Sequence, residues 1–144
     1  MDLKNLNIFR ELAVDLDKVD NGTWVNVTPT IRMRLARLDR PEAVAVRTRI
    51  REEHKVSLDL MKTMNRHEEL EELNRKLLGQ TLAESIVKDW EGLTINGEDV
   101  PFSQETCENL LCSPQLGELV ERILRFSSNW ESFRAQEIEA ATKN

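Results

Sequence analysis

The chain has 144 residues, of which 26 are acidic and 20 are basic, so its net charge is −6. A chain of this length can bury roughly two-thirds of its unfolded surface, which makes an independent hydrophobic core feasible. The acidic balance argues against nucleic acid as the main partner, and no apolar run approaches the roughly 18 residues of a membrane helix.

The first forty residues predict a small antiparallel sheet. Residues Thr23–Thr28 and Thr30–Leu38 alternate apolar and polar side chains, which is typical of strands with one solvated face. Turn residues, Asp20-Asn21-Gly22, precede the first of these strands. Leu12–Val19 is a candidate third strand, and Leu3–Glu11 fits a short helix as well as an edge strand.

Long helices are expected between Asp39 and about Trp90. Asp39 and Glu42 form the pattern of a capping box, with Pro41 tolerated in the first turn. A single fifty-residue helix would be unusual in so small a domain. We therefore expect a helical hairpin that turns near Asn65. Gly79, which costs about 1 kcal/mol relative to alanine inside a helix, is the alternative place for a kink or for the turn itself.

The stretch Val87–Ser103 predicts a rigid corner between two helical groups. The first helix is expected to stop at Glu91-Gly92-Leu93, after which Asn96-Gly97 reverses the chain. We expect Trp90 to pack its ring on the following helices while its N–H finds a partner. Phe102 is expected to staple onto a helix that Ser103 caps.

Three helices are predicted after this corner. They run from Ser103 to about Leu111, from Ser113-Pro114 onward, and from about Asn129 to Ala141. The predicted fold class is therefore α+β and predominantly α-helical. Residues 1–144 are expected to form a single domain, with a small β-rich part at 1–38, long helices at 39–92 and C-terminal helices at 93–144.

The sequence offers no candidate catalytic, cofactor or metal site. Cys107 and Cys112 are five residues apart on a predicted helix, so they lie on different faces and fit buried thiols in a reducing cytoplasm. His54 and His67 fit helix surfaces, since His67 has no second histidine one turn on. There is no phosphate-binding loop and no nucleophile elbow. We therefore expect that the protein is not an enzyme.

Basic residues are concentrated between Arg32 and Lys55, where eight of them stand against four acidic residues. One interpretation is that arginine stems lie over apolar surface. The other is that a basic face docks an acidic partner, which includes another copy of this acidic chain. Nucleic-acid binding is a weaker third interpretation. Arg32, Arg34 and Arg37 are the candidate partner-binding residues of this segment.

Three sequence blocks resemble the tail assembly chaperones of long-tailed bacteriophages. The main block, IVKDWEGLTINGEDVPFSQETCENLL, carries the motif residues Trp90, Gly92, Leu93, Gly97, Val100, Pro101, Phe102, Ser103, Leu110 and Leu111. The other blocks are NGTWVNV with IRMRLARLDRPEA, and the closing NWESFRAQEIEAATKN. The final Thr-Lys-Asn is also compatible with codons on which ribosomes slip, as in the programmed frameshift that is common in this family.

This resemblance implies a chaperone in the host cytoplasm that binds the tape-measure protein and is absent from the mature virion. A frameshifted longer form would recruit the tail-tube protein, and a homo-oligomer is compatible with the basic segment. The candidate residues for apolar contact with the partner are Trp90, Leu93, Phe102, Trp130 and Phe133. Each of them is also suited to a place in the hydrophobic core. The alternative is a small structural tail or head-completion subunit that stays in the virion.

Overall fold

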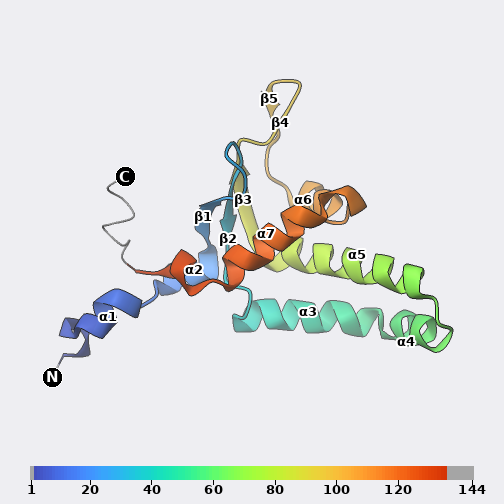
Figure 1. Cartoon of the computed structure of the whole chain (residues 1–144), viewed down its shortest axis with the longest axis horizontal. Coiled ribbons are helices and arrows are strands. Elements are labelled where there is room, and N and C mark those ends of the chain that lie inside the picture. Colours follow the sequence, from blue (N-terminus) through green and yellow to red (C-terminus); the bar gives the residue numbers. More distant parts are fainter. Residues whose placement is uncertain (1, 136–144) are drawn as a thin grey trace.

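A central three-stranded antiparallel sheet organises the protein, and its strand order is β1-β2-β3. The computed structural model describes residues 2–135. Long helices extend from one side of the sheet, and an N-terminal helical arm extends from the other (Figure 1). The α+β, helix-dominated fold class is therefore confirmed.

The sheet consists of β1 (Thr23–Asn26), β2 (Arg32–Leu35) and β3 (Val87–Glu91). The first two strands were expected, but the third strand comes from a segment predicted to be helical, not from Leu12–Val19. Val87–Glu91 forms a strand because pairing with β2 places Val87 and Trp90 in the core, opposite Leu35 and Met33. The register shifts between Arg34 and Leu35, so Lys88 is the extra residue of a β-bulge.

The N-terminal segment is helical, which decides between the helix and the edge strand that the sequence allowed for Leu3–Glu11. A 3₁₀ turn, η1 (Leu3–Asn5), precedes α1 (Asn7–Leu12) and α2 (Leu16–Asn21). The Asp15 side chain caps α2 by accepting a hydrogen bond from the backbone N–H of Asp17. Residues of the proposed third strand therefore belong mostly to helices.

The predicted helical hairpin is confirmed. It consists of α3 (Pro41–Glu53), α4 (Lys55–Thr63) and α5 (His67–Ser85), and it turns at Asn65, whose φ is 55°. Gly79 makes neither a kink nor the turn, because it lies inside α5 where the end of α6 approaches closely.

The predicted capping box at the start of α3 is wrong. The helix begins after Arg40, which makes no side-chain cap. The Asp39 carboxylate instead accepts a hydrogen bond from Nε of Arg37, at 2.9 Å. This ion pair competes with the cap for the same carboxylate.

The corner around Trp90 joins a strand to helix α6, so the prediction that a helix ends at Glu91-Gly92-Leu93 is wrong. Gly92, with φ of 85°, ends a strand and not a helix. A small hairpin, β4 (Thr94–Ile95) and β5 (Glu98–Asp99), then turns at Asn96-Gly97 and projects from the body (Figure 1). Trp90 Nε1 donates to the Val100 carbonyl at 2.8 Å. The Trp90 ring also meets Phe102 edge-on at 4.9 Å, so the expected packing role of Trp90 is confirmed.

Two of the C-terminal helical segments begin at the predicted capping residues, Ser103 and Ser113. Ser103 caps α6 (Gln104–Leu111) by accepting from the backbone N–H of Thr106. A 3₁₀ turn, η2 (Pro114–Leu116), leads into α7 (Gly117–Ser128). Where the last helix was predicted, the chain forms only a 3₁₀ turn, η3 (Trp130–Phe133), and becomes extended at Arg134. Residues 136–141 of that prediction lie outside the described residues.

The main core lies between the sheet and helices α5, α6 and α7. Its fully buried side chains include Met33, Leu35, Leu82, Ile86, Leu111 and Ile123. A smaller core of Ile50, Leu58 and Leu77 stabilises the hairpin. Both cysteines are free, and burial raises the pKa of the Cys107 thiol to about 12. No helix among residues 2–135 combines the length and the apolar character needed to cross a membrane.

Candidate functional site

The N-terminal segment exposes more large apolar side chains than any other part of the described chain. Six of them are between 41% and 72% exposed: Leu3, Leu6, Ile8, Phe9, Leu12 and Leu16. No residue of η1, α1 or α2 is buried. A six-residue helix is far below the roughly 12–15 residues that an isolated helix needs in water. We call residues 3–16 the apolar arm, and its helix α1 gains little stability from packing within residues 2–135.

A short backbone ladder attaches the apolar arm to the end of the described chain. The Asp15 N–H donates to the Phe133 carbonyl at 2.8 Å, and the Ala135 N–H donates to the Ala13 carbonyl at 2.9 Å. Val14 and Arg134 face each other in an isolated antiparallel bridge. The base of the arm is thus fixed, while α1 projects away from the body (Figure 1).

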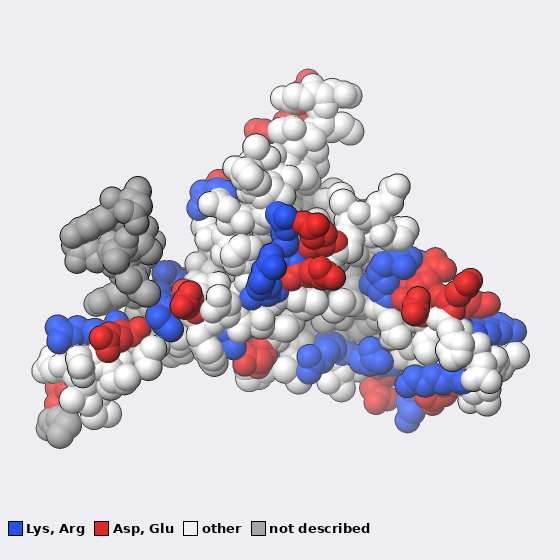
Figure 2. All heavy atoms as spheres, viewed as in Figure 1, with Lys and Arg blue, Asp and Glu red and all other residues white. Residues whose placement is uncertain are grey.

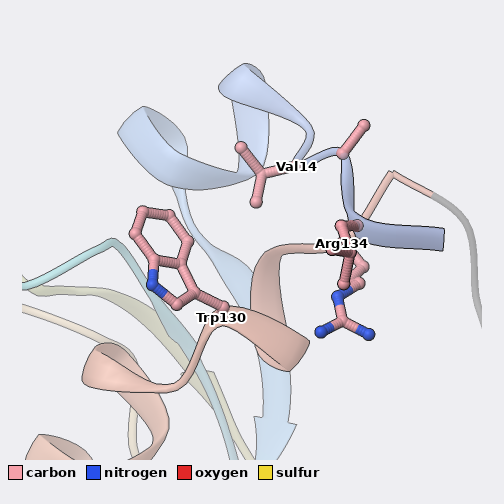
Figure 3. Close-up of a pocket in the computed structure, with 5 residues that line it drawn as sticks. Val14, Trp130 and Arg134 are labelled. Carbon is pink, nitrogen blue, oxygen red and sulfur yellow. The ribbon is translucent and has the colours of Figure 1, made fainter. Parts of the chain in front are cut away.

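Two hollows, which we call the arm hollows, lie beside this attachment. The larger, of about 480 Å³, is lined by Leu12, Ala13, Val14, Trp130 and Arg134. In the view of Figure 3, Trp130 and Arg134 lie on either side of this hollow, with Val14 between them. The smaller, of about 230 Å³, is lined by Lys4, Phe9, Arg10, Ala13 and Ala135.

The orientation of Trp130 is set by its neighbours. The Arg37 guanidinium carbon lies 3.6 Å from the centre of the Trp130 ring and 5.7 Å from that of Phe133, which is fully buried. Asp39 in turn fixes the Arg37 guanidinium. The Trp130 side chain is nevertheless 51% exposed, so a held aromatic ring contributes one wall of the larger hollow.

The predicted partner-binding residues divide into separate groups. Arg37, Trp130 and Phe133 lie together, and only Trp130 lines an arm hollow. Trp90, Leu93 and Phe102 lie together at the corner, where Trp90 belongs to the core and the other two pack against it.

The remaining predicted arginines lie on the sheet. Arg32 is exposed, pairs with Glu91 at 3.1 Å and lies over the ring of Trp24. Arg34 is half-buried, and together with Arg40 it lowers the pKa of Lys88, for which burial is the larger cause. Arg37 and Arg40 are only 6% and 4% exposed, and guanidinium nitrogens of both are buried, so their charged ends are covered as well as their stems.

Sequence reasoning missed the apolar arm as a binding surface. It also missed a second apolar stripe on α4, where Val56, Leu60 and Met64 are exposed at a spacing of four residues. The signal for both was apolar residues at helical spacing, which predicts an apolar face but not whether that face is covered.

Among residues 2–135, no group of three or more His, Cys, Asp or Glu side chains converges as a metal site. The His54 ring is engaged with the carbonyl of Ile50. Acidic and basic side chains are intermixed over the hairpin helices, with no field of one sign on the face seen in Figure 2.

Comparison with known proteins shows that this α+β chain is a phage-derived protein. Residues 33–144 match the model of the family described as the YdaY prophage protein, and the chain belongs to that family. No match was found among curated proteins or among solved structures. Trp130 and Arg134 lie within the matched residues, whereas the apolar arm lies before them.

Proposed function

We propose that this prophage protein is a tail assembly chaperone that binds the tape-measure protein in the host cytoplasm and is absent from the mature virion. The observation that carries the proposal is the apolar arm, which exposes six large apolar side chains beside the arm hollows. Phage origin and the resemblance of the Trp90–Ser103 corner to tail assembly chaperones support the more specific role.

The physical task of such a chaperone is to cover apolar helices and keep the complex soluble. An amphipathic helix can be held against an apolar groove by residues one turn apart. The arm presents Phe9 and Leu12 at such a spacing, with Leu12 lining the larger hollow together with Trp130 and Phe9 lining the smaller one. The net charge of −6 keeps the complex in solution.

The proposal includes two further partners. A frameshifted longer form recruits the tail-tube protein, and copies of the chain self-associate during assembly. Neither nucleic acid nor membrane takes part.

Co-expression with the tape-measure protein of the same prophage tests the proposal. The wild type is compared with an arm variant, Ile8→Ser with Phe9→Ser and Leu12→Ser. The matched control changes the exposed stripe on α4, Val56→Ser with Leu60→Ser and Met64→Ser. All six side chains are exposed, so neither variant disturbs the core.

The wild type and the control should keep the tape-measure protein soluble and co-purify with it, whereas the arm variant should lose both effects. Aggregation of the tape-measure protein with the wild type, or equal recovery with the arm variant, contradicts the proposal. Mass spectrometry of purified virions then tests the structural alternative, because a retained subunit would be found there in stoichiometric amount.

A further inference from the structure

The arm hollows share one electrostatic property. Their described lining contains three charged residues, Lys4, Arg10 and Arg134, and all three are cations. The other lining residues are apolar: Phe9, Leu12, Ala13, Val14, Trp130 and Ala135. The chain has 26 acidic residues and a net charge of −6, so a described lining whose charged members are all cations is distinctive.

Three aspartates of the N-terminal segment accept local hydrogen bonds, whereas the exposed carboxylate of Glu11 lies on α1 next to Arg10 in the sequence. Asp2 accepts a hydrogen bond from the backbone N–H of Lys4 at 3.0 Å, which caps η1. Asp15 accepts from the backbone N–H of Asp17 at 2.9 Å, which caps α2. Asp17 accepts from Nδ2 of Asn21 at 2.6 Å. Asp2 and Asp15 therefore cap helix N-termini, and neither these aspartates nor Glu11 are among the described lining residues of the hollows.

The three cations have no ion-pair partner within residues 2–135. Nε of Arg134 is buried and has no hydrogen-bond partner in the described part of the chain. Lys18 donates to the Arg134 carbonyl at 3.1 Å, so it adds another positive charge at this position. Within residues 2–135, the surface thus combines cations that form no ion pair with exposed apolar side chains.

We propose that the arm hollows bind an amphipathic helix whose apolar face is flanked by Glu or Asp residues. Apolar side chains of that helix pack against Phe9, Leu12 and Trp130, while its carboxylates pair with Arg10, Arg134 and Lys4. The inference rests on the proposed function in one respect, since it assigns this chemistry to the segment of the tape-measure protein that is bound.

A second copy of the chain fits the arm hollows less well than a helix from a different protein. Its most acidic helical segment is the beginning of α5, where Glu68, Glu69, Glu71 and Glu72 are exposed. The apolar residues of that segment, Leu70 and Leu73, already pack against the smaller core of the hairpin. That segment has no free apolar face to offer, so a different protein supplies the helix.

Two synthetic 18-residue helical peptides provide the test. Both carry the same leucine face, and the flanking positions are glutamate in one and lysine in the other. We expect the full-length protein to bind the glutamate peptide about tenfold more tightly in 0.1 M salt, because each of three exposed ion pairs contributes roughly a factor of two. The difference should shrink in 1 M salt, where the screening length falls to about 3 Å.

Two charge variants distinguish ion pairing at the arm hollows from the general effect of removing three positive charges from the protein. Lys4→Gln with Arg10→Gln and Arg134→Gln should abolish the preference for the glutamate peptide. The matched control, Arg47→Gln with Lys55→Gln and Lys62→Gln, removes the same charge from exposed positions on α3 and α4 and should keep the preference. Equal binding of both peptides, binding of neither, or a preference that survives the first variant overturns the inference.

Comparing the peptide assay with the co-expression assay shows which of the two claims fails, the chaperone function or the preference for an acidic helix. If the wild type solubilises the tape-measure protein but shows no peptide preference, the chaperone function stands and this inference falls. If the preference is found but the tape-measure protein aggregates, the inference stands and the chaperone function falls. A dimer in sedimentation equilibrium that dissociates in the Ile8→Ser, Phe9→Ser, Leu12→Ser variant makes a second copy the occupant and also overturns the inference.

Discussion

Replacing Gly79 with alanine should destabilise the protein, although alanine is the better helix former. Inside a helix, glycine costs about 1 kcal/mol relative to alanine, so helix propensity alone predicts a gain of that size. A Cβ at position 79, however, would lie 2.8 Å from the Cys112 Sγ, 3.0 Å from the Leu111 carbonyl carbon and 3.1 Å from the Cys112 backbone nitrogen. Two of these atoms are backbone atoms and cannot rotate away.

The magnitude follows from the competition between these two effects. Overpacking a close contact typically costs about 1–3 kcal/mol, which exceeds the gain in helix propensity. We expect a net loss of about 1 kcal/mol in the free energy of unfolding, which lowers the melting temperature by about 3–5 °C for a chain of this size. Urea unfolding followed by circular dichroism measures the change.

Gly117 provides the matched control. It is the first residue of α7, its φ is −57°, and a Cβ there would meet no atom within 4 Å. Gly117→Ala should therefore leave stability unchanged or raise it by up to about 1 kcal/mol. Equal stabilisation by Gly79→Ala and Gly117→Ala would refute the close approach of α5 and the end of α6.

Three further predictions concern the corner and the core. Gly92→Ala should cost about 2–4 kcal/mol in urea unfolding, because φ is 85° and the new Cβ would clash with the Thr30 carbonyl oxygen. A loss below about 1 kcal/mol would contradict that backbone geometry. Trp90→Phe should cost about 2–3 kcal/mol, because the Val100 carbonyl loses its donor; a neutral substitution would show that this hydrogen bond is not needed. Burial raises the pKa of the Cys107 thiol to about 12 in the folded protein, against roughly 8.5 in the unfolded chain. Its contribution to the free energy of unfolding is therefore complete below pH about 8.5 and is lost as the pH rises toward 12. The urea midpoint should therefore fall between pH 9 and 10.5 in the wild type and fall less in Cys107→Ala, whereas identical pH profiles contradict the burial of this thiol.

Local turn and cap chemistry was predictable from the sequence. Asn65 and the Asn96-Gly97 pair adopt positive φ at the predicted turns, and Ser103 caps α6 as expected. These features depend on a few adjacent residues, whose backbone preferences are the same in any fold.

Strand β3 was not predictable, because its pairing is non-local. Lys88 and Asp89 make the segment resemble a solvated helix face, and only the unpaired edge of β2 gives Val87–Glu91 its hydrogen-bond partners. The missing cap at Asp39 has a similar origin, since the position of Arg37 next to Trp130 determines where the Asp39 carboxylate pairs.

The candidate site was predictable only in part. Trp130 was a candidate from its size, but its stacking on Arg37 requires the end of the described chain to return to the sheet. The apolar arm was missed because its spacing matches that of a helix packed on a core. Whether an apolar face such as that of Phe9 and Leu12 is covered depends on where the rest of the chain lies.

Hydrogen exchange in the apolar arm, with and without the tape-measure protein, tests the central claim most directly. In the free protein, the amides of Phe9 and Arg10 should exchange rapidly, because α1 has no buried residue, while those of Ile123 and Leu124 in α7 exchange slowly. In the complex, exchange at Phe9 and Arg10 should slow by about tenfold or more, with α7 unchanged. Arm amides that are already as protected as α7 in the free protein, or that do not change on binding, would contradict the assignment of the arm as the partner-binding surface.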